Sequence, residues 1–193
     1  APTVAGEQTP ATPIPIDSEA TDPEQLTLRE AFPDRKVTLN GRTYRRVRTD
    51  LTADCAKAAS GAFAEQLAAQ NCRRLLRATY VDGKRKYAVT VGIAVLPDRE
   101  AAVAVDQAKD LANNRWFRAL SAPAGTGGER VGIAGGYAAG LVWGRYIVFS
   151  YATYADGHTP TAEERDLVPV SSAFRDHIAQ VIEKRAGRRP VSE

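Results

Sequence analysis

The two cysteines constrain the fold of this chain more than any other feature of its sequence. Cys55 and Cys72 flank an alanine-rich segment, residues 53–70, that has the apolar periodicity of an amphipathic helix. One straight helix between the cysteines would hold their Cα atoms about 25 Å apart at a rise of ~1.5 Å per residue, whereas a disulfide tolerates no more than ~7 Å. A complete helix and a disulfide therefore exclude each other. A helix break at Ser60-Gly61 would remove the conflict.

We predict that Cys55 and Cys72 form a disulfide. An isolated pair of cysteines in an exported domain is normally oxidised. Closing the loop between them would stabilise the folded state by about 3 kcal/mol if the bond acts by restricting the unfolded chain. Free buried thiols and pairing between two chains are the alternatives. The spacing differs from the Cys-x-x-Cys pattern that lowers a thiol pKa, so a redox role is not expected.

Residues 1–21 are rich in proline, threonine and alanine and show no apolar periodicity. This composition is typical of a disordered tether. The chain contains no methionine, so we expect that its encoded start was removed, either with a signal peptide or by a cut after a membrane anchor upstream of Ala1. Removal of an initiator methionine before Ala1 is the alternative. Together with the cysteine pair, the tether predicts an extracytoplasmic protein, either membrane-anchored or secreted.

The rest of the chain has the length of one domain and predicts an α+β fold. We place this domain at residues 22–187 and a frayed tail at 188–193. The order strand, strand, helix occurs twice, which predicts an antiparallel sheet with helices packed mainly on one face. The expected elements are a short helix at 24–31, a hairpin over 36–39 and 42–48 about Asn40-Gly41, strands at 75–81 and 87–96, a helix at 99–113, short strands at 131–133 and 137–143, a strand at 145–155, and a helix from Ser171-Ser172 to 186.

Apolar spacing also predicts which side chains are buried. In the strand at 87–96, apolar residues alternate with small or polar ones, so one face is expected to be buried and the other lightly covered. Trp116 and Phe117 are expected to anchor the core. The residues expected to face the core from the helix at 99–113 are Val103, Ala104, Ala108 and Leu111.

Charge is unevenly distributed along the chain. Residues 1–34 carry a net charge of −6, which leaves +9 on residues 35–193 out of the total of +3. A body with this charge could attract a polyanion such as nucleic acid, anionic lipid or an anionic cell-wall polymer. The alternative is an ordinary solvated surface in which arginine takes the place of lysine.

Basic residues gather in three short stretches. On a strand Arg46 and Arg48 would share a face with Tyr44, a mixture of basic and aromatic side chains that binds phosphates or bases. No DNA- or RNA-binding motif frames them, so nucleic acid is not the favoured ligand. The candidate anion-binding residues are Arg46, Arg48, Arg73, Arg74, Lys84, Arg85 and Lys86.

Catalytic signatures are sparse. His158 follows Asp156 in a turn, where the two could act as acid and base or hold a metal, although two polar residues in a turn usually only form the turn. His177 lies beside the apolar stripe of a helix and is interpreted as an ordinary boundary residue. The Gly-rich loop at 125–128 lacks the Lys-Ser/Thr pair of a phosphate-binding loop, and no nucleophile or metal motif is present. We therefore predict no cofactor, no metal and no enzymatic activity.

Three runs of the sequence carry a resemblance to known proteins: CRRLLRATY at 72–80, VTVGIAVLP at 89–97 and GRYIVF at 144–149. In these runs the chain resembles extracytoplasmic domains of uncharacterised actinobacterial membrane proteins. The resemblance covers residues 22–186. It implies an anchored domain on the outer side of the cytoplasmic membrane and implies no catalytic residues.

We expect from these observations a non-catalytic extracytoplasmic domain that binds a protein partner or an anionic component of the cell envelope. One alternative is a sensor with an apolar cavity for a small ligand, lined by Trp116 or Trp143. The other is an enzyme with a dispersed site around His158, including Asp156 and Asp166. The sequence does not indicate the oligomeric state.

Overall fold

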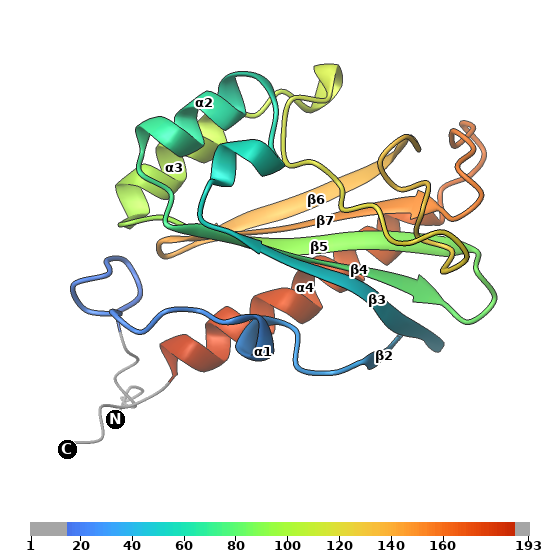
Figure 1. Cartoon of the computed structure of the whole chain (residues 1–193), viewed down its shortest axis with the longest axis horizontal. Coiled ribbons are helices and arrows are strands. Elements are labelled where there is room, and N and C mark those ends of the chain that lie inside the picture. The colour runs from blue at the N-terminus through green and yellow to red at the C-terminus, as the bar shows by residue number, and fades with distance from the viewer. Residues whose placement is uncertain (1–14, 188–193) are drawn as a thin grey trace, which may run out of the picture.

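The computed structural model describes residues 15–187, which form an antiparallel sheet with helices on both of its faces (Figure 1). The sheet has six strands in the order β2-β3-β4-β5-β7-β6. The strands are β2 (Lys36–Leu39), β3 (Arg42–Thr52), β4 (Arg74–Asp82), β5 (Tyr87–Val95), β6 (Gly136–Trp143) and β7 (Tyr146–Tyr154). The helices are α1 (Leu28–Ala31), α2 (Gly61–Ala69), α3 (Arg99–Gln107) and α4 (Leu167–Ala186), with 3₁₀ turns η1 (Cys55–Ala58) and η2 (Leu111–Asn113). The predicted α+β class and antiparallel sheet are confirmed.

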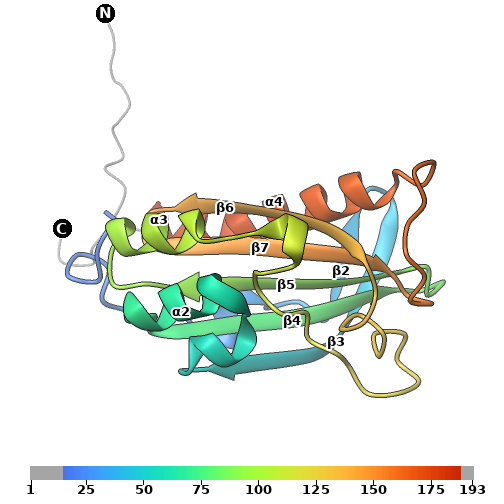
Figure 2. The same cartoon turned by 90° about the horizontal axis from the view of Figure 1, so that it is seen from above.

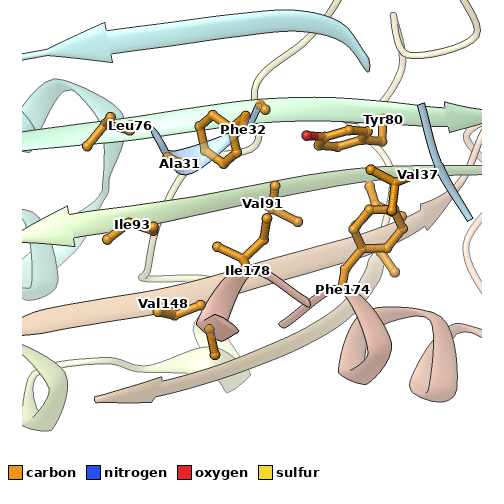
Figure 3. Close-up of a cluster of buried hydrophobic side chains, with 14 of the residues drawn as sticks. Ala31, Phe32, Val37, Leu76, Tyr80, Val91, Ile93, Val148, Phe174 and Ile178 are labelled. Atoms are coloured by element: carbon orange, nitrogen blue, oxygen red, sulfur yellow. The ribbon is translucent and has the colours of Figure 1, made fainter. Parts of the chain in front are cut away.

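Helix α4 lies along one face of the sheet and covers the largest cluster of buried apolar side chains (Figure 3). Phe174 and Ile178 on α4 point toward strand residues such as Val91. The ring of Tyr44 on β3 meets Phe174 edge to face, with the centroids 4.7 Å apart. Such a contact adds about 0.5–1.5 kcal/mol to the burial of the two rings. Helix α4 is therefore the main cover of this face.

Helices α2 and α3 cover one end of the opposite face (Figures 1 and 2). Phe117 stacks on Phe149 with the centroids 4.0 Å apart, and Phe63 meets Phe117 edge to face at 4.7 Å. The helices were predicted mainly on one face, whereas they are divided between both. The reason lies in the middle strands: all 9 residues of β5 are buried, so both faces need cover. The lightly covered face predicted for 87–96 is thus a buried one.

Two strand–strand–helix units are present, β4-β5-α3 and β6-β7-α4, as the sequence predicts. Their second strands, β5 and β7, are antiparallel neighbours. If the two units were related by a twofold axis, that axis would exchange β5 with β7. An axis that exchanges two antiparallel neighbours is perpendicular to the sheet, so it would place both helices on the same face. Because α3 and α4 lie on opposite faces, the units repeat in chain order but are not related by symmetry.

The disulfide between Cys55 and Cys72 is confirmed, with the two Cα atoms 6.1 Å apart. The predicted helix break is also present, because η1 ends before Ser60 and α2 begins at Gly61. Gly61 has a φ of +66°, and a Cβ on it would lie 2.7 Å from Cδ of Arg115. Both the backbone and the neighbouring side chain thus require glycine there. A disulfide is consistent with an oxidising environment.

Residues 15–21 were predicted to belong to the tether, but they are part of the fold. Ile16 is buried, and its carbonyl oxygen accepts a hydrogen bond from the backbone N–H of Arg145 at 2.9 Å. The carbonyl oxygen of Asp17 accepts one from the N–H of Arg99 at 2.8 Å. The fold therefore begins before residue 22. The rest of the predicted tether, 1–14, and the predicted tail, 188–193, lie outside the described residues.

A buried ionic cluster fastens this N-terminal segment to α4 and β7. The Asp22 carboxylate pairs with Arg185 at 2.7 Å and with Arg145 at 3.2 Å, and it accepts the hydroxyl of Tyr146. Arg185, which is only 1% exposed, also donates two hydrogen bonds to Glu30 at 3.1 and 2.7 Å. Charges at this depth are tolerated because each one has several partners. The cluster holds together segments that lie far apart in the sequence.

Three helix predictions need correction. The short helix expected at 24–31 begins only at Leu28, after the cap residue Thr27. The helix expected at 99–113 ends at Gln107, and its buried residues are Ala101, Ala102 and Val105 rather than the four expected ones. Leu111, expected to face the core, is 48% exposed. Alanine suits either face of a helix, so the apolar spacing allowed two stripes and did not distinguish them.

The last helix begins at Leu167, ahead of the expected caps at Ser171 and Ser172. Pro169 fits in its first turn, where the missing N–H has no partner to lose. Ser171 is buried and hydrogen-bonds to Ser150 at 2.6 Å instead of capping. The short strand expected at 131–133 is a turn. Within residues 15–187 no helix has both the length and the apolar character that a membrane crossing requires.

Candidate functional site

The seven cations predicted to bind anions do not form one site. Arg73 and Arg74 lie at the start of β4 and hold the N-terminal segment. Arg73 donates to both carboxylate oxygens of Glu19, at 3.1 and 2.7 Å, and this hydrogen bonding lowers the pKa of Glu19. Arg74 donates to the carbonyl oxygen of Leu26 at 3.1 Å and to Oε1 of Gln25 at 2.8 Å. These two arginines are structural.

A β-bulge in β3 separates Arg46 from Arg48. Arg46 is opposite Tyr80 and Arg48 is opposite the next residue, Thr79, so one extra residue of β3 is inserted between them. Strand side chains alternate between faces, and the bulge shifts this alternation by one. Arg46 consequently donates to the carbonyl oxygen of Phe32, whereas Arg48 reaches that of Ser121 at 2.6 Å. The prediction that these arginines share a face is wrong.

A buried carboxylate organises the turn between β4 and β5. Asp82 accepts hydrogen bonds from the backbone N–H groups of Lys84 at 3.2 Å and of Lys86 and Tyr87 at 2.7 Å, and it pairs with Arg42 at 2.8 Å. The ammonium of Lys86 lies 3.6 Å from the carboxylate of Asp166. Of the three predicted cations in this turn, Lys86 is therefore paired. Lys84 and the neighbouring Arg85 form no ion pair within the described part of the chain.

Six cations line two adjoining hollows on the β2–β3 side of the sheet. The first hollow, of about 300 Å³, lies between β2, β3 and the β4–β5 turn, and the second, of about 420 Å³, follows β3. Lys36 and Arg45 line both hollows, so the two form one track. We term the six cations the basic edge: Arg35, Lys36, Arg45, Arg46, Arg48 and Arg85.

Within residues 15–187 the cations of the basic edge outnumber the acidic groups beside them. Asp82 lines the first hollow but is already paired with Arg42. Lys36 and Arg45 are directly opposite each other in the β2–β3 ladder, and like charges in that position destabilise a sheet. None of the six cations forms an ion pair with another residue of 15–187. Uncompensated cations around a hollow attract oxyanions, because each oxygen accepts a charge-assisted hydrogen bond.

Arg85 projects from a backbone conformation that is unusual for a long side chain. Its φ is +55°, and the hydrogen bonds to Asp82 hold the turn in this shape. The loop that carries Gly127 packs against it, and a Cβ on Gly127 would lie 3.4 Å from Cδ of Arg85 and 2.8 Å from Cγ1 of Val81. Glu129 lies close enough to Arg85 for the two charges to interact. Hydrogen bonds from backbone N–H groups are the main cause of the lowered pKa of Glu129, and Arg85 contributes to it.

Asp156 and His158, which were predicted as a pair, are in contact, and Glu164 contacts the other side of the His158 ring. Nδ1 of His158 lies 2.5 Å from Oδ1 of Asp156, and Nε2 lies 3.1 Å from both carboxylate oxygens of Glu164. The ring stacks on Tyr154 with the centroids 4.3 Å apart. Hydrogen bonding to Asp156, and then to Glu164, raises the pKa of His158 and favours the imidazolium ion. Both ring nitrogens are thus occupied by carboxylates.

Asp166, the third residue of the considered enzyme site, serves another purpose. It accepts the hydroxyl groups of Tyr87 and Tyr154, which anchors the start of α4 to the strands. Burial opposes the ionisation of Asp166, but these hydrogen bonds outweigh it and the pKa of Asp166 is lowered. His177 is half-buried on α4, and burial lowers its pKa. Among residues 15–187 no group of three or more His, Cys, Asp or Glu is arranged to hold a metal ion.

A groove of about 810 Å³ lies on the same side of the sheet as α2 and α3, between β6 and the loop 114–135. Trp116, one of the two tryptophans considered for a ligand cavity, lines this groove, whereas Trp143 packs against the α4 side. Ile133 also lines it and is 85% exposed. The groove is therefore open to solvent, unlike the enclosed apolar cavity that a small-ligand sensor would use. Its loop residues have no periodicity from which the sequence could predict it.

Comparison of the chain with protein-family models, with curated proteins and with solved structures found no match.

Proposed function

We propose that this chain is a non-catalytic domain that acts outside the cytoplasm and binds a linear, phosphate-bearing polymer of the cell envelope through the basic edge. The proposal is carried by one observation: six cations surround two adjoining hollows, and none of them has an ion pair within the described residues. Arginine contacts two phosphate oxygens at once, and lysine adds a point charge. The composition of the basic edge therefore suits phosphate groups.

A polymer fits the basic edge better than a single anion does. Because Lys36 and Arg45 line both hollows, a chain that follows β3 would place successive phosphates in the two. Arg85 would contact one end of such a chain and Arg48 the other. Several linked contacts raise the apparent affinity well above that of one phosphate.

The location and the absence of catalysis are parts of the same proposal. The disulfide between Cys55 and Cys72 supports an oxidising compartment, and therefore a place outside the cytoplasm. The only histidine placed near a carboxylate pair, His158, is held by Asp156 and Glu164 among the described residues, which supports a structural role for it.

The test is isothermal titration calorimetry of the whole chain at low salt with a short polyphosphate of defined length. Inorganic phosphate and phosphatidylglycerol vesicles are titrated in parallel. We expect polyphosphate to bind more tightly than inorganic phosphate. Lys36→Ala/Arg45→Ala should weaken it about a hundredfold, because each charge-assisted contact contributes about 1.5 kcal/mol, or roughly tenfold.

Arg99→Ala is the matched control, since Arg99 is an exposed cation on α3 outside both hollows. The affinity of this variant for polyphosphate should equal that of the wild type. Equal affinity of the double variant and the wild type would overturn the proposal, as would no binding of polyphosphate. Binding of vesicles without binding of polyphosphate would assign the basic edge to a membrane surface instead.

A further inference from the structure

Strand β6 is an outer strand of the sheet, and within residues 15–187 it pairs with β7 alone (Figure 2). Its eight residues, GYAAGLVW, include no charge and no proline, and every one of them is at least partly exposed. Within residues 15–187 its backbone hydrogen bonds all go to β7. Proteins normally protect such an edge with lysine, proline, a bulge or a covering segment. We term β6 the open edge.

The groove beside the open edge carries apolar anchors and cations together. Ile133 lines it with 85% exposure, and Trp116 and Ala138 of the apolar cluster under α2 and α3 line it as well. Arg115 and Arg118 line it as well, and neither forms an ion pair within the described part of the chain. No aspartate or glutamate is among the lining residues. The groove is therefore complementary to a segment that bears both apolar and acidic side chains.

We infer that the open edge docks an extended segment of an acidic partner protein as an additional antiparallel or parallel strand. The backbone of the segment would use the unpaired N–H and C=O groups of β6. Side chains of a strand alternate between faces, so every second side chain of the segment would enter the groove beside Ile133 and Ala138. An acidic side chain there would pair with Arg115. This site lies on a different edge of the sheet from the proposed polymer site and is independent of it.

A second copy of this chain is a poorer occupant than an acidic protein. Pairing β6 with β6 would bring together two folded bodies that each carry a net charge of +3 over residues 15–187, −5 on 15–34 and +8 on 35–187. It would also bring two grooves with unpaired arginines close to each other, and like charges at an interface disfavour association. Charge complementarity therefore selects an acidic segment.

The experiment selects a phage-displayed library of random dodecapeptides on the whole chain. Enriched peptides are then synthesised, and their affinities are measured by fluorescence polarisation. Tyr137→Lys places a charge on the open edge, Arg115→Glu reverses a groove charge, and Leu51→Lys adds a charge to an exposed apolar residue on the other edge as the control. Hydrogen exchange maps the amides that the peptide protects.

We expect enriched peptides in which apolar and acidic residues alternate, with new protection at residues 136–143. Tyr137→Lys and Arg115→Glu should each weaken binding by about tenfold or more, while Leu51→Lys leaves it unchanged. No enrichment over an unrelated protein, equal binding by Tyr137→Lys, or protection confined to other strands would each overturn the inference. A dimer that Tyr137→Lys dissociates would assign the open edge to a second copy instead. The same variants are also titrated with polyphosphate. Unchanged polyphosphate affinity in Tyr137→Lys and Arg115→Glu would show that peptide binding at the open edge is independent of phosphate binding at the basic edge.

Discussion

The two outer edges of the sheet are built in opposite ways. On one side β2 has only 4 residues, β3 contains a bulge, and cations line the track beside them. On the other side β6 offers 8 uncharged residues without a bulge. Short strands, bulges and charges all prevent the addition of a further strand. The first edge is therefore suited to recognition by side-chain charge, and the second to recognition by backbone pairing.

The disulfide supports only one of the two regions. Ser60, between the cysteines, donates its backbone N–H to the carbonyl of Trp116 at 2.9 Å, and Arg118 donates to that of Ala58 at 2.7 Å. These bonds connect the disulfide loop to the groove. No comparable bond within residues 15–187 leads from this loop to Lys36 or Arg45.

The largest expected effect follows from Cys55→Ala/Cys72→Ala. The variant should lose about 3 kcal/mol of unfolding free energy in urea denaturation, because the unfolded chain is no longer restricted. Hydrogen exchange should rise in α2 and around Trp116, and peptide binding at the open edge should weaken, while polyphosphate affinity is retained. Equal losses of peptide affinity and of polyphosphate affinity would contradict the separation of the two regions.

Salt should affect the two edges differently. Raising the salt concentration fourfold should lower polyphosphate affinity about 20-fold, the slope expected when three cations neutralise phosphates. Peptide affinity should fall by less than about threefold, since backbone hydrogen bonds are not screened. Titrations with both ligands at the two salt concentrations check this. If the peptide lost as much affinity as polyphosphate, the open edge would also bind through charge alone.

Arg85→Asn sharpens the comparison within the basic edge. Asparagine accepts a φ of +55° more readily than arginine, so stability should rise by about 0.5 kcal/mol. Polyphosphate affinity should fall by roughly tenfold with the loss of one charged contact. Thermal unfolding and calorimetry measure the two effects. A gain in stability without a loss of affinity would remove Arg85 from the site.

The smallest effect is on pH dependence. The pKa of His158 is raised above its usual value of 6.5, so its stabilising contribution is complete below that value and is lost as pH rises through the raised pKa. His177, with a pKa lowered by burial, acts in the opposite sense, so the wild type is compared with His158→Gln. Urea denaturation should show that the unfolding free energy of the wild type declines as the pH rises above 6.5 and through the raised pKa of His158. The His158→Gln variant should not show this decline. A decline that persists in the variant would exclude His158 as its source.

The sequence predicted those features that depend on local chemistry. The Asn40-Gly41 turn and the helix break that permits the disulfide are both confirmed. These features depend on backbone conformations that few residue types satisfy. They are therefore visible without knowledge of the fold.

The predicted anion site was only partly recovered, because long-range contacts decide which cations are free. Arg73 is paired with Glu19, which is 54 residues away, and no local pattern indicates that contact. The bulge that separates Arg46 from Arg48 has no glycine to signal it. Lys36 and Arg45 could have been found, since the predicted turn at Asn40-Gly41 fixes the register that places them opposite each other.

The central claim is that the basic edge binds a phosphate-bearing chain, and the most direct measurement is an NMR titration of the ¹⁵N-labelled protein with polyphosphate. We predict that the largest chemical-shift changes occur at Lys36, Arg45 and Arg85 and that amides of β6 are unaffected. Saturable changes centred on α3 or β6, or no saturable change at the basic edge, would contradict the account.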